Sequence, residues 1–224
     1  MNQTWYAYLV WIAAAGLLGF AISVVFAGVL RLPRKVFLIP YIGFIGLFLY
    51  AYVRWSGLSI GEMLGHNWVW GLVGALILGI MTIRNVLSQP ASPRAKGLNL
   101  AFDLLWSGFL YGLTDGLLLS VLPVLATWQA FTLLGWTANG PGRLLVALLA
   151  ILASMLVTSA YHFGYPEFRG ERLITANVGN TAMTLGYLVT SNPLAAMICH
   201  AAIHMAAVLH GPELVVQLPP HYQS

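Results

Sequence analysis

Three histidines lie in one apolar stretch near the C-terminal end of the sequence, Asn192 to Gly211, which reads NPLAAMICHAAIHMAAVLHG. In a helix, His200 and His204 would lie one above the other on one face, about 6 Å apart along the axis. His210 would lie about 120° from His204 around that helix. Two imidazoles on one face can hold a metal ion or a reacting group together, and lipid offers them no water as an alternative partner. This pair is therefore the first candidate for a functional site.

Asp115 is the second candidate, because it lies near the middle of an apolar segment around YGLTDGLLLS. An ionised carboxylate in a membrane costs about 3 kcal/mol or more unless it is paired, hydrated or protonated. An acid in this position therefore indicates a functional site. The alternative is a structural residue, protonated or hydrogen-bonded, that caps a helix break at Gly112 or Gly116.

His162, in SAYHFGYPEF, lies near the end of another apolar segment. Alone it would be interpreted as an interfacial or core residue. Together, His162, His200, His204 and Asp115 offer three nitrogens and one oxygen, the ligand types that suit zinc or another borderline divalent metal. The HxxxH spacing lacks the glutamate of HExxH, so a general base must come from elsewhere. The sequence therefore predicts one divalent metal, zinc first, as the only cofactor.

Other polar residues are weaker candidates. Asn177 and Asn180 share a face of one predicted span, and they either bond to a site or tie helices together. Asp103 can reach interfacial water, and Cys199 is most simply a packed small side chain. His66, His210 and His221 lie near helix ends or in the tail, where hydration accounts for them.

The composition is that of a membrane protein. Of the 224 residues, 59% are hydrophobic and 7% are charged, and the mean hydropathy is +0.82; a soluble domain has roughly 25% charged residues. These values predict an all-α polytopic membrane bundle of about seven helices, within a range of six to eight. The net charge of +4 is small and confined to loops, which argues against nucleic acid as a partner. The expected surroundings are the lipid bilayer, with a partner subunit as an open alternative.

The expected spans follow from the hydropathy pattern, and by residue range they are 5–30, 36–53, 68–83, 98–136, 143–164, 173–190 and 192–211. The apolar segment 98–136 is too long for one upright helix, so a kink or break is expected at Pro123. If the chain crosses twice there, the count becomes eight. The chain is then divided into two N-terminal helices (1–53), a helical core (54–211) and a short tail (212–224), all in one membrane domain.

Basic residues predict the orientation. They gather in the loops around Arg31 to Lys35 and Arg84 to Lys96, which the positive-inside rule places in the cytoplasm. With seven spans the N-terminus is outside and the C-terminus cytoplasmic, in the cell membrane. A straight single crossing would place Asp115 nearer the outer leaflet than His162. A shared site therefore requires a break or a tilt between Gly112 and Pro123.

Three stretches resemble the CAAX prenyl protease and bacteriocin-processing (CPBP, or Abi) family of intramembrane proteases. They are RWSGLSIGEMLGHNWVWGLVGALILGIM, SAYHF and TLGYLVTSNPLAAMICHAAIH, within residues 54–210. The family's first motif is a glutamate pair followed four residues later by arginine. Here Thr114 and Asp115 stand in the place of the pair, no arginine follows, and His204 stands where the family has Asn or Asp.

The resemblance implies a CPBP-like helical core and an intramembrane hydrolase that cleaves a peptide bond in a lipid-embedded or lipidated substrate. Asp115 would then activate water, His162 and His200 would bind metal or stabilise an oxyanion, and His204 would be an extra ligand or donor. The departures leave two alternatives. One is a non-catalytic member of this fold that binds a peptide, lipid or partner subunit, and the other is a membrane subunit whose histidines ligate a cofactor.

Overall fold

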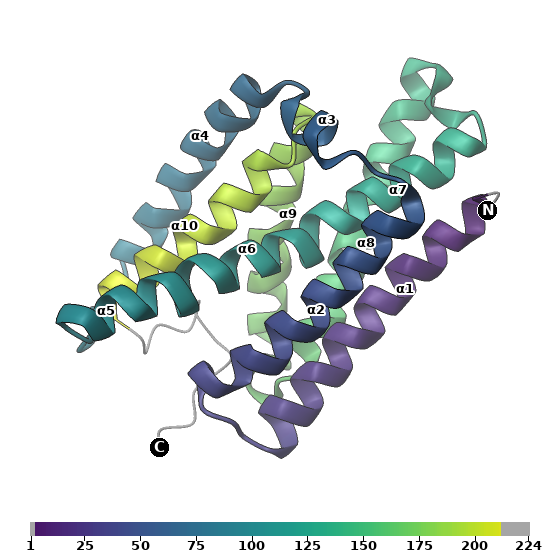
Figure 1. Cartoon of the computed structure of the whole chain (residues 1–224). Coiled ribbons are helices and arrows are strands. Elements are labelled where there is room, and N and C mark those ends of the chain that lie inside the picture. The colour runs from purple at the N-terminus through teal and green to yellow at the C-terminus, as the bar shows by residue number, and fades with distance from the viewer. Residues whose placement is uncertain (1–2, 212–224) are drawn as a thin grey trace.

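A computed structural model of the chain describes residues 3–211, and this part of the chain is all-α (Figure 1). Five helical stretches are long and apolar enough to cross a membrane, which confirms the predicted class of protein. By number they cover residues 5–29, 34–56, 68–87, 97–133 and 140–163. The predicted tail, with His221, lies outside the described residues.

The helix bounds agree closely with the predicted spans. The first helix, α1, continues into a π-helical end, η1, and the short α3 lies between the second and third predicted spans. The last helix, α10, has 17 residues and is shorter than the five long stretches. The bounds outside the central helix are α1 Trp5–Ile22, η1 Ser23–Val29, α2 Arg34–Ser56, α3 Ile60–Gly65, α4 Trp68–Leu87, η4 Trp136–Ala138, α8 Gly140–Phe163, η5 Pro166–Phe168, α9 Glu171–Thr190 and α10 Leu194–His210.

A single long helical path of 37 residues, Gly97–Leu133, forms the centre of the molecule. It consists of α5 Gly97–Asp103, η2 Leu104–Leu110, α6 Tyr111–Asp115, η3 Gly116–Val121 and α7 Leu122–Leu133. Of the predicted kink or break at Pro123, the break is wrong, because the helix continues through this residue. Pro123 lies in the first turn of α7, directly after the π-helical η3. A π-helical turn already departs from the α-helical hydrogen-bond ladder, so a proline that lacks an N–H is accommodated there.

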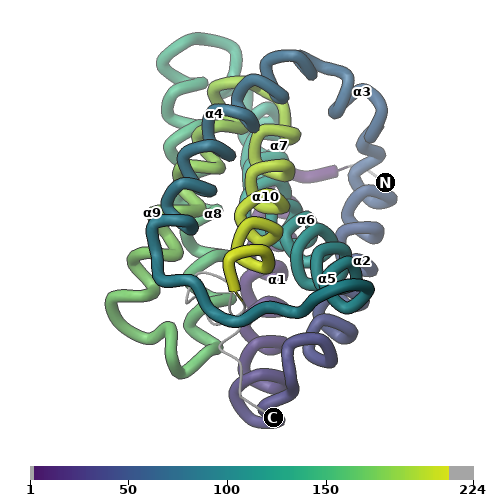
Figure 2. Tube along the Cα trace, turned by 90° about the vertical axis from the view of Figure 1, so that its left-hand side faces the viewer, coloured from purple at the N-terminus to yellow at the C-terminus, as the bar shows by residue number. Residues whose placement is uncertain are grey.

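The long path is tilted against its neighbours. At 1.5 Å per residue it is about 55 Å long, nearly twice the ~30 Å hydrocarbon core of a bilayer. Figure 1 shows it crossing α9 obliquely, and Figures 1 and 2 show α10 running beside it. This tilt, and not a break at Pro123, is what allows a residue in the middle of the path to lie beside the C-terminal helices.

Glycines bring the long path and α10 into backbone contact. Gly108, Gly112 and Gly116 are four residues apart and all face α10. A Cβ atom at Gly112 would lie 2.6 Å from the carbonyl oxygen of His200 and 2.7 Å from the Cα of Ala201. Small residues at this spacing allow helices in membranes to approach closely. The contact places Asp115 next to the histidines of α10.

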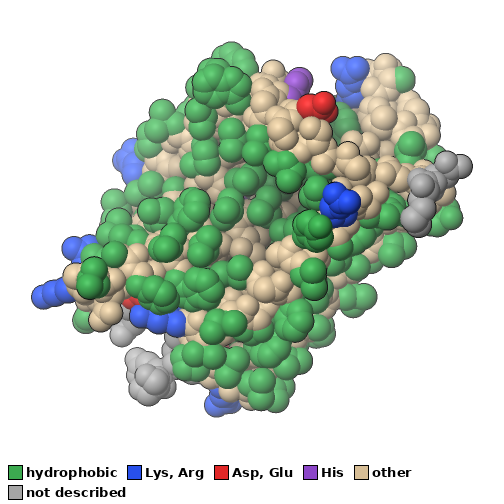
Figure 3. Space-filling model, in the orientation of Figure 1, with side chains coloured by type: hydrophobic (Ala, Val, Ile, Leu, Met, Phe, Trp, Pro, Cys, Tyr) green, Lys and Arg blue, Asp and Glu red, His purple; other side chains and the backbone are tan. Residues whose placement is uncertain are grey.

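The outer surface of the bundle is apolar. Figure 3 shows hydrophobic side chains over most of one face, with most of the charged side chains near its edges. Leu47 on α2, Leu76 on α4 and Leu152 on α8 are all more than half exposed. A surface of this kind is suited to lipid, which agrees with an integral membrane protein.

Candidate functional site

Asp115 and His204 form a buried carboxylate–imidazole pair. Their side chains come from α6 and α10, and the distance from His204 Nε2 to Asp115 Oδ2 is 3.3 Å. The residues are only 4% and 6% exposed. The hydroxyl of Tyr41, on α2, donates a hydrogen bond to the other carboxylate oxygen, Oδ1. Both partners of Asp115 come from other helices, so this carboxylate does not cap a break in its own helix.

Buried tyrosines surround this pair. The ring centroids of Tyr111 and His204 are 4.5 Å apart, and the Tyr111 and Tyr161 hydroxyls are separated by 3.0 Å. The Tyr41 ring stacks on Tyr161 with centroids 5.3 Å apart. These aromatic contacts fix the orientation of the imidazole and of the Tyr41 hydroxyl.

His200 belongs to a second polar cluster, centred on Asn180 of α9. The distance from His200 Nε2 to Asn180 Oδ1 is 3.1 Å. The same Oδ1 accepts a hydrogen bond from Ser120, and Asn180 Nδ2 lies 2.8 Å from Ser154 Oγ and 2.7 Å from Thr158 Oγ1. Because these contacts fix Oδ1 as the acceptor, His200 presents its N–H at Nε2. Asn180 therefore both ties helices together and contacts a predicted site residue.

His162 is held by its own helix. Its Nδ1 lies 2.9 Å from the backbone oxygen of Thr158. A carbonyl oxygen only accepts hydrogen bonds, so Nδ1 carries the hydrogen, and in the neutral ring Nε2 carries the lone pair. His162 and His200 thus differ in character: the first is fixed as a proton acceptor and the second as a donor.

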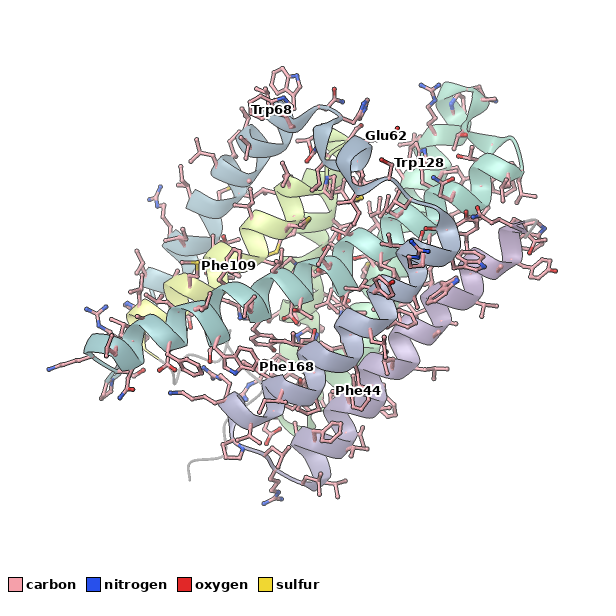
Figure 4. All side chains as sticks on the ribbon, in the orientation of Figure 1. Phe44, Glu62, Trp68, Phe109, Trp128 and Phe168 are labelled. Carbon is pink, nitrogen blue, oxygen red and sulfur yellow. The ribbon has the colours of Figure 1, made fainter. Side chains whose placement is uncertain are left out.

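One cavity of about 180 Å³ connects all four predicted site residues. Asp115, His162, His200 and His204 line it together with Asn180 and several apolar side chains. The α9 side of its wall includes Arg172 and Thr175, which are exposed. Phe168, labelled in Figure 4, lines it from the turn between α8 and α9. The structure therefore brings together four side chains that are as much as 89 residues apart in the sequence.

The four side chains do not form a metal site in this arrangement. Among residues 3–211, no group of three or more His, Cys, Asp or Glu side chains is placed to hold one metal ion. Each of the three imidazoles instead contacts a protein partner of its own, namely Thr158, Asn180 or Asp115. The donor set thus does not fit the expected zinc ion, and no chemical step below uses a metal.

The weaker candidates have structural partners. Asp103 forms an ion pair with Lys35, with 2.6 Å between Oδ1 and Nζ. Cys199 is buried, and its Sγ lies 3.6 Å from Thr82 Oγ1. His210 does not depend on hydration alone, because its Nε2 donates to the backbone oxygen of Gln89 at 2.6 Å.

Sequence reasoning missed the tyrosines and Arg172. Tyr111 precedes Asp115 by four residues and so shares its helix face, which is a signal that was present in the sequence. Tyr41 has no such signal, because it comes from a span 74 residues away. Arg172 lies in the first turn of α9 and lines the cavity, and the sequence analysis did not single it out.

Comparisons of the chain with protein-family models, curated proteins and solved structures find no match. The resemblance to CPBP proteases therefore stays a prediction. The interpretation of the site depends on its geometry: a buried acid and three imidazoles around one cavity.

Proposed function

We propose that this chain is an intramembrane hydrolase of CPBP type that acts by acid–base chemistry. The observation that carries the proposal is the shared cavity, in which Asp115 pairs with His204 while His162 and His200 lie on the same wall. Titratable side chains that converge on one cavity are the usual mark of an active site.

In the proposed reaction, Asp115 is the general base. It accepts a proton from a water molecule as the water oxygen attacks the carbonyl carbon of the substrate. It then returns that proton to the leaving nitrogen as the carbon–nitrogen bond breaks. The N–H of His204 and the hydroxyl of Tyr41 stabilise the ionised carboxylate between turnovers.

The other two histidines have separate parts in the proposal. His200 carries its hydrogen on Nε2, and in the proposed reaction this N–H leaves Asn180 Oδ1 and donates to the oxygen that becomes negative in the tetrahedral intermediate. His162, with its lone pair on Nε2, accepts a hydrogen bond from the attacking water and orients it. These two roles follow from the hydrogen-bond partners of each histidine. They replace the single role that the resemblance implied for both His162 and His200.

The proposed substrate is a peptide segment embedded in the membrane or carried by a lipid. The walls of the cavity are largely apolar, with Leu119, Phe168, Met183 and Ile203 among them. At about 180 Å³ the cavity is smaller than a typical ligand pocket of ~300–1,000 Å³. It suits the scissile part of a chain, with the remainder in the bilayer.

A binding protein without catalysis is the second candidate. Its supporting observation is that each cavity histidine already contacts a protein partner, and that the Asn180 cluster is internally satisfied. Satisfied polar networks of this kind stabilise a bundle without any reaction. The absence of the glutamate pair and the arginine favours the same candidate.

The test compares Asp115 with Asp103, two acids on the long helical path. Asp115→Asn keeps the size of the side chain but removes the base, so turnover should fall about 10²–10⁴-fold. Asp103→Asn is the matched control, because Asp103 pairs with Lys35 instead of lining the cavity. The measurement is cleavage of quenched peptides, lipidated and unlipidated, by protein reconstituted in vesicles. Full activity of Asp115→Asn would contradict the mechanism. Binding of these peptides without any cleavage by the wild-type protein would favour the second candidate.

A further inference from the structure

Two further cavities lie side by side beneath α3. Leu58, Met63 and Leu125 line both of them. They are separate from the cavity of Asp115, which has none of these residues in its lining. The walls of one cavity are almost entirely apolar, whereas the other has several polar side chains. This difference is the basis of the inference.

The first of these cavities is apolar. It measures about 360 Å³, within the ~300–1,000 Å³ of small-molecule sites. Its walls come from five helical elements, including Val53 of α2, Val121 of η3 and Met197 of α10. A cavity with such walls gains nothing from water, and in a membrane protein the apolar molecules at hand are lipid chains.

The second cavity has mixed walls, part polar and part apolar, and measures about 270 Å³. Ser59, Glu62, His66 and Ser191 contribute its polar side chains. Among its described lining residues, Glu62 is the only acidic one, and none is a lysine or an arginine. Figure 4 shows Glu62 on α3, at the end of the bundle where α7 carries Trp128. A carboxylate here attracts a cationic group and repels an anionic one.

Helix α3 forms the roof of both cavities, and several contacts hold it in place. Gly57, at φ +67°, ends α2 in a left-handed conformation that turns the chain toward α3. The Oγ of Ser59 accepts a hydrogen bond from the backbone N–H of Glu62 at 3.3 Å. The side chain of Asn192 donates to the backbone oxygens of Leu64 and His66. The roof is thus fixed to the turn between α9 and α10, so the two cavities are preformed.

We propose that these paired cavities bind a membrane lipid that carries a primary ammonium group. One acyl chain occupies the apolar cavity, and the ammonium group lies beside the Glu62 carboxylate. The site is independent of the hydrolase proposal, because Leu119 faces the Asp115 cavity while Leu117 and Val121 line the apolar one. The lipid therefore binds on the opposite side of η3 from the acid and the histidines.

The headgroup preference is tested by native mass spectrometry of the purified protein. Phosphatidylethanolamine and phosphatidylglycerol with identical acyl chains are added at equal concentration. We expect the ethanolamine lipid to have about fivefold higher occupancy, because one solvent-accessible contact between opposite charges has an effect of this size on binding. Glu62→Gln should bring the two lipids to equal occupancy, whereas Glu171→Gln, an exposed acid in the first turn of α9, should leave the preference unchanged.

The acyl-chain site is tested by filling the apolar cavity. Val53→Trp should lower the occupancy of both lipids about tenfold or more, since the indole takes the place of the chain. Leu148→Trp, on the exposed face of α8, is the matched control and should bind as the wild type does. Met63→Trp, on the short α3, replaces Val53→Trp if that variant does not fold. Equal binding of both lipids by the wild-type protein, or undiminished binding by the filled variant, would overturn the proposal.

Discussion

At the scale of single residues, the pair of Asp115 and His204 defines the site. Both side chains are buried, and each compensates for the cost of burying the other. Tyr41 supports the carboxylate from a third helix. A family asparagine or aspartate at position 204 would lack the imidazole that contacts Asp115 here. His204 thus belongs to the same unit as the acid.

His204→Ala should destabilise the protein by about 2–3 kcal/mol, because the buried carboxylate loses one of its two partners while Tyr41 remains. His66→Ala, at an exposed position, is the control and should change the unfolding free energy by less than about 0.5 kcal/mol. Reversible unfolding in mixed micelles measures both.

Adding Asp115→Asn to His204→Ala removes the buried charge that has lost its imidazole partner. The double variant should therefore lose less stability than the sum of the two single variants. Additive losses would show that Asp115 and His204 do not interact in the membrane.

At the scale of helices, the contact between the long path and α10 assembles the site. The three glycines at positions 108, 112 and 116 allow this contact, and the tilt of the path brings Asp115 to the level of α10. The π-helical segments η2 and η3 flank α6 on both sides, and π-helical turns are frequent at functional sites. The position of the acid therefore depends on helix packing as much as on the sequence around it.

Gly112→Ala tests this dependence, because the added methyl group would lie against the backbone of His200 and Ala201. We expect a loss of about 1–3 kcal/mol in stability and a fall in turnover as the two helices separate. Gly46→Ala on α2, where a Cβ meets nothing within 4 Å, is the control and should be neutral or slightly stabilising. A wild-type stability and activity for Gly112→Ala would show that the close approach is dispensable.

At the scale of the whole molecule, the path from Gly97 to Leu133 is continuous, and five helical stretches are long and apolar enough to cross a membrane. Seven crossings, with one in this segment, stay a prediction. The loops rich in arginine and lysine then lie on one side. The paired cavities beneath α3 lie toward the other side, at the end of the bundle where α2 ends and α4 begins (Figure 1).

The orientation can be measured by cysteine labelling in whole cells, in a Cys199→Ala background that removes the single native thiol. Ser59→Cys, before α3, should react with a membrane-impermeant maleimide added outside. Ser88→Cys, after α4, should react only once the membrane is permeabilised. The reverse pattern would show that the chain is inserted with the opposite orientation.

Much of the architecture is readable from the sequence because bilayer thickness and backbone hydrogen bonding leave little choice. The hydropathy pattern predicted the bounds of these helices to within a few residues. It did not exclude a break at Pro123, because hydropathy and proline chemistry do not reveal a π-helical turn. It also could not predict Tyr41 as a partner of Asp115, since that contact joins residues 74 positions apart.

The sequence by itself determined which side chains could do chemistry, namely an acid and three histidines that would be costly in lipid without a local partner. Only the tertiary structure decided how they are paired. It joined His204 to Asp115, His200 to Asn180 and His162 to its own helix, and so separated the nitrogens that zinc would require together. The physical reason is that spacing along one helix fixes which residues share a face, whereas helix tilt and the close approach at the glycines fix which faces meet.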